Sequence, residues 1–318
     1  MSATLPDIMD VARALAPAPL SPRSTAVLES CLEPLRMSVW PDIAWQFSRL
    51  TRDGFPAEFA FSGRDAALRL TIEPGGPELP EDEKLDAALR LLDAIRHRRP
   101  APTLIALWRD IQRQAALRWG AWLGLRQSTK NVRTKLYVEV PRGARYQAAS
   151  AAPLGGRLRM IGYEPDTERS EFYYVLPEKD APRLSRTLEE HGIDEPGALL
   201  DAMAALAGLP VATALQWLGV GLSVATRVGR RHAGIAIYFR AAAVRGGQGR
   251  IRDALLRQQD AQGLRDTPYR ALFASTDAFA LPDHGVVTIG VQPDGGMELR
   301  AGISGNALLN RWNVQRDS

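Results

Sequence analysis

The sequence of 318 residues is poor in cysteine, histidine and aromatic residues, and each shortage excludes a class of protein. Cys31 is the only cysteine, so no intramolecular disulfide can form, and we expect a protein of the reducing cytoplasm. The four histidines lack the spacing of metal ligands: His97, His191, His232 and His284. Aromatic residues make up 7% and hydrophobic residues 45%, which excludes disordered and collagen-like chains.

Neither sign of charge is in large excess. The chain has 40 Lys and Arg against 36 Asp and Glu, and a net charge of +4 fits an anionic ligand as readily as a nucleic acid. One set of arginines makes a basic nucleic-acid-binding protein the competing class: Arg227, Arg230, Arg231, Arg245, Arg250 and Arg252. Because no aromatic RNA-binding motif accompanies them, we expect no nucleic-acid partner.

The N-terminal twenty residues do not combine a basic start with an apolar run, so they do not read as a secretory signal. Residues 202–226 carry no charge, and this uncharged stretch is long enough for a membrane span. However, Gly208, Pro210, Gly219 and Gly221 interrupt this stretch. We interpret it as a helix end, a break, a short helix and a buried strand that starts near Gly219, and we expect no membrane association.

What the sequence does contain is an alternation of two periodicities. Apolar spacing of three and four predicts helices over 24–36, 84–98, 101–117, 180–191, 196–207, 248–259 and 305–312. Period-two runs predict hairpins of 57–62 with 67–73, 121–127 with 132–140, 157–163 with 169–176, 219–225 with 234–240, and 285–291 with 297–303.

This series predicts an α/β fold: an antiparallel barrel of about five helix-hairpin (ααββ) repeats with its helices outside. We expect a single domain over 1–318, in which 1–23 are a leader and 24–312 form the barrel. No linker or low-complexity stretch divides the chain.

Strand alternation assigns the two faces of the sheet. In 132–140, Leu136 and Val138 share one face, while Arg133, Lys135 and Tyr137 share the other. The same division recurs in every hairpin. If helices cover the apolar face, the polar face lines the lumen of the barrel.

The simpler alternative is a solvated sheet face, which is the usual meaning of alternating charge. Against it, tyrosines recur at one offset beside the cations, and the cations outnumber the acids, as expected of a polar, Tyr-lined lumen that holds a polyanion. The further residues that we expect to contact the lumen are Trp122, Arg133, Glu171, Arg240, Glu298 and Arg300.

Two motifs resemble the aromatic prenyltransferases called the ABBA or PT-barrel family. Pro56-Ala57-Glu58-Phe59, followed by Leu68-Arg69-Leu70-Thr71-Ile72-Glu73-Pro74, is similar to the first hairpin of the dimethylallyltryptophan synthase branch. In that branch a strand glutamate precedes a pyrophosphate-binding arginine by eleven positions, as Glu58 precedes Arg69. Arg133-Thr134-Lys135-Leu136-Tyr137 resembles the second hairpin motif.

The later hairpins depart from the family pattern while keeping its order over about 50–305. Arg169 and Tyr173 match the third hairpin, but Glu171 stands where the branch usually has lysine. Tyr238 matches the fourth, and Arg300 stands where a tyrosine is common. The length matches the compact bacterial members, which include indole enzymes and cyanobactin peptide prenyltransferases.

The resemblance implies an enzyme of secondary metabolism that transfers a prenyl group, dimethylallyl first, from prenyl pyrophosphate to an indole or tryptophan-derived acceptor and releases pyrophosphate. It implies that Arg69, Lys135 and Arg169 bind pyrophosphate and that Tyr137, Tyr173 and Tyr238 shield the prenyl cation. Glu58 is the implied catalytic carboxylate.

The resemblance also implies that the only co-substrate is dimethylallyl or a longer prenyl pyrophosphate, with no cofactor and no requirement for Mg²⁺, in a monomer or weak homodimer. There is no Asp-Asp-x-x-Asp cluster of the kind that binds magnesium in isoprenyl chain-elongating enzymes. A peptide side chain is the alternative acceptor, and a barrel that binds without catalysis is a further alternative. Without the resemblance, each of three residues has a simpler structural interpretation. Glu58 is then an ordinary edge carboxylate, Arg169 forms a salt bridge with Glu168 or Glu171, and Tyr238 is a packing residue.

Overall fold

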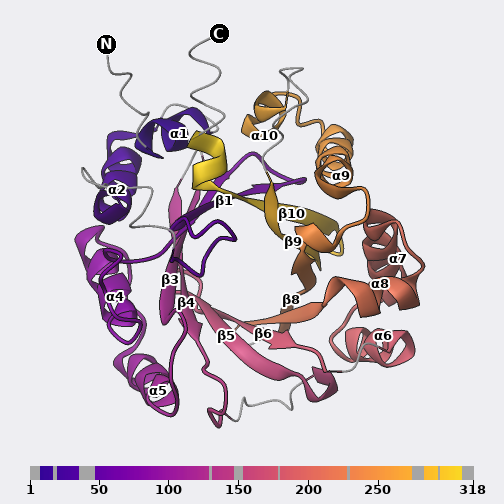
Figure 1. The fold of residues 1–318 in the computed structure, drawn as a ribbon, viewed down its shortest axis with the longest axis horizontal. Helices are drawn as coiled ribbons and strands as arrows, with labels where there is room; N and C mark the ends of the chain where they lie inside the picture. The colour runs from indigo at the N-terminus through magenta and orange to yellow at the C-terminus, as the bar shows by residue number, and fades with distance from the viewer. Residues whose placement is uncertain are drawn as a thin grey trace.

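Ten antiparallel strands close into a barrel at the centre of the protein, with helices around it (Figure 1). The computed structural model describes residues 8–16, 20–35, 47–128, 131–146, 153–177, 180–227, 230–273, 283–292 and 294–309. The strands follow one another around the barrel in chain order, and the first pairs with the last to close it. They are β1 (Ala57–Ser62), β2 (Leu68–Ile72), β3 (Ala121–Gln127), β4 (Val132–Glu139), β5 (Arg157–Glu164), β6 (Arg169–Val175), β7 (Gly221–Arg227), β8 (Arg230–Arg240), β9 (His284–Val291) and β10 (Met297–Ser304).

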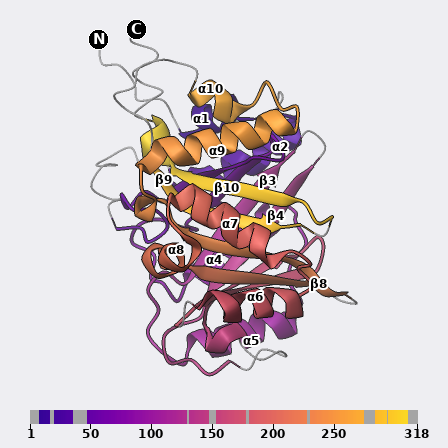
Figure 2. The same cartoon turned by 90° about the vertical axis from the view of Figure 1, so that its right-hand side faces the viewer.

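The apolar side chains of the strands point outward and pack against the helices. Leu136 and Val138 on β4 are fully buried in this outer layer, as are Leu123 on β3 and Ile237 on β8. Figure 2 shows α7 and α9 lying across the outside of β9 and β10. The helices are α1 (Ile8–Ala14), α2 (Pro22–Leu32), α4 (Lys84–Ala94), α5 (Pro102–Gln112), α6 (Ala181–Glu190), α7 (Pro196–Ala207), α8 (Val211–Leu218), α9 (Gly247–Ala261) and α10 (Pro268–Leu272).

The fold predicted from the sequence is confirmed, and each predicted hairpin is present within a few residues of its expected bounds. Its repeats are less regular than expected, because between β4 and β5 the described residues form only the short 3₁₀ helix Pro153–Gly155. The predicted helix over 305–312 is seen over 305–309, and its remainder lies outside the described residues.

Two helices have no counterpart among those predicted. Helix α1 lies within residues 1–23, which we expected to be a leader, and its Ile8, Met9 and Val11 are buried in the core. Helix α10 is the five-residue segment Pro268–Leu272, capped by the Thr267 side chain. Both are short, and so few residues give little helical periodicity to detect.

No single helix in the described ranges is long and apolar enough to cross a membrane. Only α7 and α8 reach that length and apolarity together, and they bend by 69° at the break between them. This is the uncharged stretch whose glycines and proline predict a break. The large apolar side chains of α7 are buried in the core: Leu199, Leu200, Met203 and Leu206.

The barrel has two different ends, which we call the first and the second mouth. Odd-numbered strands begin at the first mouth and even-numbered strands end there, as the pairing of Ala57 with Ile72 shows. The segment 47–56 leads to this mouth and reaches over the barrel interior (Figure 1), and residues 48–54 line the cavity inside. The hairpin turns, such as 63–67 and 165–168, lie at the second mouth.

Candidate active site in the barrel lumen

The barrel encloses a cavity of about 1750 Å³. Every side chain that we expected in the lumen belongs to its lining, because successive inward positions of the strands face the barrel axis. These residues are Glu58, Arg69, Trp122, Arg133, Lys135, Tyr137, Arg169, Glu171, Tyr173, Tyr238, Arg240, Glu298 and Arg300. The sequence therefore identified side chains that line one cavity, and the structure adds how some of them are paired.

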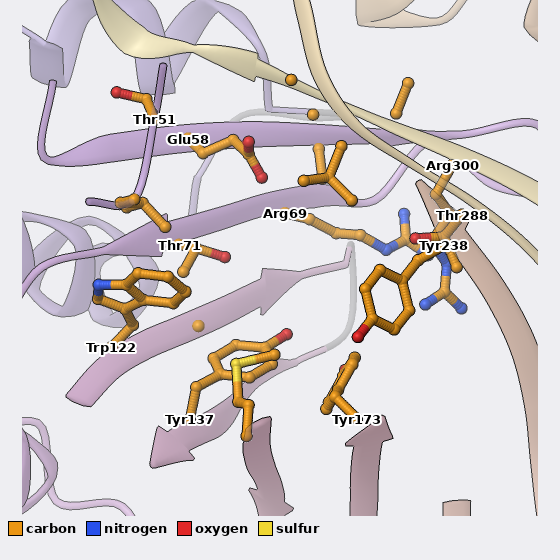
Figure 3. A pocket seen from close by; sticks show the side chains of 18 of the residues that line it. Thr51, Glu58, Arg69, Thr71, Trp122, Tyr137, Tyr173, Tyr238, Thr288 and Arg300 are labelled. Atoms are coloured by element: carbon orange, nitrogen blue, oxygen red, sulfur yellow. The ribbon is translucent and has the colours of Figure 1, made fainter. Parts of the chain in front are cut away.

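Three tyrosines form a row along one wall of the lumen. The ring centroids of Tyr137 and Tyr173 lie 6.2 Å apart, and those of Tyr173 and Tyr238 lie 5.9 Å apart. Figure 3 shows all three rings directed into the cavity. The hydroxyl of Tyr238 donates a hydrogen bond of 2.9 Å to the carbonyl of Tyr174. A Cβ atom at Gly221 would lie 2.2 Å from Cζ of Tyr238, so this ring position requires glycine on the neighbouring strand.

The ammonium group of Lys135 lies among these rings and forms an ion pair with Glu171. Its Nζ donates a hydrogen bond of 3.0 Å to the hydroxyl of Tyr173 and lies 5.1 Å from the ring centroid of Tyr137. Burial alone would raise the pKa of Glu171, but Lys135, Arg169 and a hydrogen bond from Ser223 outweigh it and lower this pKa to about 2. Burial opposes the charge of Lys135, yet Glu171 holds its pKa well above the usual value.

Arg169 lies beside this pair and is only weakly held. Its Nη1 is 3.9 Å from the carboxylate of Glu164, and its buried Nε has no hydrogen-bond partner among the described residues. Arg169 does form an ion pair, but with Glu164 and not with Glu168 or Glu171, the partners of the alternative interpretation, and a 3.9 Å contact is too long for a hydrogen bond. Its guanidinium retains donors for a ligand.

Arg69 and Arg300 are instead bound tightly to acidic side chains. Arg69 donates two hydrogen bonds, of 2.8 and 2.6 Å, to Asp65, and Arg300 donates two, of 2.7 and 2.6 Å, to Glu298. Glu298 also accepts a 2.6 Å bond from Ser62 and lies 3.5 Å from Arg69. A diphosphate that binds Arg69 must therefore share this cation with Asp65. Asp65 precedes Arg69 by four residues, which is the signal by which the pairing could have been anticipated.

Glu58 faces the lumen from β1, on the same side as Thr71 and Trp122 (Figure 3). A Cβ atom at Gly302 would lie 2.3 Å from Cδ of Glu58, so a glycine on β10 makes room for this carboxyl. Burial, together with the nearby charge of Asp53, raises the pKa of Glu58 to about 7. No described side chain or amide donates a hydrogen bond to it. Such a carboxyl is available to a ligand as an acceptor of a proton or a hydrogen bond.

Trp122 forms an aromatic wall beside Glu58. It stacks on Trp119 with ring centroids 3.8 Å apart and an angle of 18° between the planes. The indole Nε1 of Trp122 is buried without a hydrogen-bond partner among the described residues.

Arg240 is exposed at the first mouth, and Arg133 is exposed toward the second. Sequence analysis missed Trp119, which precedes β3.

Within the described residues, no three or more His, Cys, Asp or Glu side chains lie together in a group that could hold a metal ion. Two acidic side chains of the lumen are instead paired with cations, Glu171 with Lys135 and Glu298 with Arg300, whereas Glu58 has no cationic partner among the described residues. Of the arginines in the competing nucleic-acid proposal, the side chains of Arg227, Arg230 and Arg231 lie outside the described part, so their patch is not tested.

The sequence matches no protein-family model, and a search of the curated proteins finds no match either. Solved structures do match. A 5-dimethylallyltryptophan synthase from Streptomyces coelicolor, in complex with DMASPP and Trp, superposes with a TM-score of 0.68 at 16% identity over 95% of this chain and 94% of that one. A 6-dimethylallyltryptophan synthase from Micromonospora olivasterospora gives 0.64 at 16% identity, over 95% and 96%.

The prenyltransferase PriB, in a binary complex with product diphosphate, gives a TM-score of 0.66 at 15% identity over 95% of this chain and 97% of that one. At these identities the likeness concerns the fold, which spans nearly the whole of each protein. The order of hairpins and the closure of β1 on β10 agree with it. The chain therefore has the PT-barrel fold of the ABBA-type aromatic prenyltransferases.

Proposed function

We propose that this protein is an aromatic prenyltransferase that moves a dimethylallyl group from its diphosphate to an indole or tryptophan-derived acceptor. One observation carries the proposal: Lys135 and Arg169 lie beside a row of tyrosine rings, and Glu58 faces the same closed lumen from β1. Cations, aromatic faces and a basic carboxylate are the three groups that such a transfer requires. Similar structures that hold DMASPP with Trp, or product diphosphate, support this choice of substrates.

The reaction begins at the diphosphate end. The bond between C1 of the donor and its bridging oxygen breaks, and the electron pair goes to the diphosphate. Lys135 and Arg169 stabilise the negative charge that develops, because charge-assisted hydrogen bonds are stronger than neutral ones. Lys135 already forms an ion pair with Glu171, so the diphosphate competes with this carboxylate for the ammonium group. Arg69 and Arg300 contribute further positive charge, and their hydrogen bonds to Asp65 and Glu298 fix their positions.

The allylic cation that remains must be protected from water. Tyr137, Tyr173 and Tyr238 present aromatic rings to it, and each cation–π contact is worth about 0.5–2 kcal/mol. A closed barrel wall without gaps between strands limits the approach of solvent to the cation from the side.

The acceptor lies between Trp122 and Glu58. Its planar ring stacks near the Trp119–Trp122 pair, and the carboxylate of Glu58 accepts its N–H. A ring carbon attacks C1 of the allylic cation and forms the new carbon–carbon bond. The proton on that carbon then leaves, with Glu58 as its acceptor, and the ring regains aromaticity. The products are the prenylated acceptor, diphosphate and one proton.

We propose that the reaction needs no Mg²⁺, since lysine and arginine side chains supply the positive charge that a metal ion would supply.

An aromatic side chain of a peptide is the second candidate for the acceptor, and the cavity of about 1750 Å³ supports it. That volume exceeds the roughly 300–1,000 Å³ of ordinary small-molecule pockets. We place the enzyme in the cytoplasm as a single-domain monomer or weak homodimer.

The test is an incubation with prenyl diphosphates of increasing length and a panel of tryptophan, tyrosine, indole and aromatic peptides, with and without excess chelator. We expect a mass increase of one dimethylallyl group on a tryptophan-containing acceptor in both conditions. A donor that binds but yields no prenylated product with any acceptor would instead support a binding protein without catalysis.

A further inference from the structure

The two mouths of the barrel differ in how their arginines are paired. At the second mouth, ion pairs join Arg64 to Asp294 at 2.8 Å, Arg69 to Asp65 at 2.6 Å and Arg126 to Asp65 at 2.9 Å. These arginines are neutralised within the protein. Arg133 is the exception there, with no ion pair among the described residues.

The first mouth carries five exposed arginines that line the cavity, and none of them forms an ion pair with a described residue. We call this set the arginine rim: Arg49, Arg52, Arg118, Arg159 and Arg240. They come from the segment before β1, the approach to β3, the start of β5 and the end of β8, so they are distributed around the opening. The acidic residues of the lining at this end are Asp53, Glu58 and Asp283.

Further cations lie beside the rim. Burial and the charges of Arg142 and Arg159 lower the pKa of Arg157, so each of these two guanidinium groups repels that of Arg157. Arg142 and Arg157 are exposed and also lack an ion pair with any described residue. Clustered like charges destabilise the folded protein and focus a positive potential on the opening, which attracts anions.

Exposed apolar side chains adjoin the rim. Trp217 is 61% exposed, and its indole Nε1 donates a 2.9 Å hydrogen bond to the carbonyl of Ala243. Val286 is 41% exposed and pairs with Arg240 in the sheet register. Tryptophan and arginine are the residues most enriched in energetically important protein contacts. A small free anion would bind to the arginines alone, whereas a peptide can contact both the arginines and the exposed apolar side chains.

The extent of the rim also indicates more than one anionic group. A single carboxylate accepts hydrogen bonds from one or two guanidinium groups. Five arginines on four different elements therefore leave most of their donors unused by a free amino acid. The cavity beneath them has room for an aromatic side chain and the donor together.

We propose that the acceptor is an acidic peptide. Its aromatic side chain enters the lumen through the first mouth, while aspartate or glutamate residues on either side of it bind the arginine rim. The peptide backbone lies against Trp217 and Val286. The transfer itself rests on the function proposed above, whereas the binding does not require it.

The test measures binding without donor, by fluorescence anisotropy. The probes are a labelled peptide with one tryptophan between glutamates, its glutamine analogue, and a single-stranded RNA of equal charge. We expect the acidic peptide to bind at least about tenfold more tightly than its analogue, and the preference to weaken at ~0.5 M salt. Arg118→Gln with Arg159→Gln should remove most of the preference.

The matched control is Arg98→Gln with Arg99→Gln, which also removes two positive charges, from exposed arginines paired with Glu168 and Asp93. It should leave the preference unchanged, and thermal melting of each variant confirms folding. Equal affinity for the two peptides, or tighter binding of the RNA, would overturn the inference. Prenylation of both peptides at equal rates would also overturn the inference, while leaving the proposed reaction intact. If the acidic peptide binds selectively but neither peptide is prenylated, only the proposed reaction is refuted.

Discussion

Lys135 and Glu171 form an ion pair across an intervening strand. Lys135 is on β4 and Glu171 on β6, and the lysine side chain passes over Gly162 on β5. A Cβ atom at Gly162 would lie 2.6 Å from Cε of Lys135, so the pair depends on a glycine at this position. The cation assigned to the diphosphate is thereby neutralised before any ligand arrives.

Glu171→Gln should tighten the binding of inorganic diphosphate by about tenfold, because Lys135 no longer has to leave a carboxylate. Calorimetric titration measures this change. Glu168→Gln, which removes an exposed acid from the turn before the same strand, is the control and should have no effect. Unchanged or weaker binding by Glu171→Gln would show that Lys135 does not contact the diphosphate.

The same pair gives an acid-dependent contribution to stability. The pKa of Glu171 is lowered to about 2 in the folded protein, so the pair stabilises the fold above the ordinary glutamate pKa and loses this effect as pH falls toward 2. Chemical denaturation of the wild type and of Glu171→Gln should therefore differ at pH 7 and converge in strong acid. A constant difference at every pH would contradict the ion pair.

Lys135→Met should abolish turnover and destabilise the protein by about 3 kcal/mol, because it leaves Glu171 buried without its partner. The double variant Lys135→Met with Glu171→Leu should regain most of this stability and none of the activity. Denaturant unfolding and a product assay separate the two effects. Activity in the stable double variant would remove Lys135 from the mechanism.

Glu58→Gln should eliminate prenyl transfer and at the same time stabilise the fold at alkaline pH. The pKa of Glu58 is raised to about 7, so its ionisation in the folded state is costly above that pH and absent below the ordinary glutamate pKa. We expect a gain of about 2 kcal/mol at pH 8 and none at pH 4. In the wild type, kcat/KM should rise as pH increases through about 7.

Tyr173→Phe should keep most of the activity, because the aromatic face remains, while Tyr173→Leu should lose at least about tenfold, the equivalent of one cation–π contact. The leucine variant should also divert donor to dimethylallyl alcohol as water reaches the cation. Chromatography of the products measures the partition. Equal losses in both variants would assign the role to the hydroxyl that accepts the hydrogen bond from Lys135 instead.

Strand alternation divided the side chains of the sheet into two sets, and the recurring tyrosines with the excess of cations indicated which set lines the lumen. Lys135 and Tyr137 alternate with the buried Leu136 and Val138, and the period of two allows only one of these sets to face inward. The turns between runs are equally local signals. For this reason the hairpins and the inward side chains followed from the sequence.

The pairing of Lys135 with Glu171 did not follow from the sequence, because it depends on contacts between segments that are distant in the chain. Glu171 and Lys135 meet only because β5 brings a glycine between their strands. The raised pKa of Glu58 depends on Asp53 and on burial in the closed barrel, where β1 pairs with β10. The arginine rim likewise has no ion pair with a described residue because no acidic side chain of the described chain lies close enough, and a linear pattern does not reveal such distances.

The most direct test of the account is to quantify diphosphate and prenylated acceptor in the same reaction, with dimethylallyl diphosphate, a tryptophan-containing acceptor and excess chelator. We expect equal amounts of the two products from the wild type and neither product from the double variant Glu58→Gln with Lys135→Met. Diphosphate released without prenylated acceptor, or no release by the wild type with any acceptor, would contradict it.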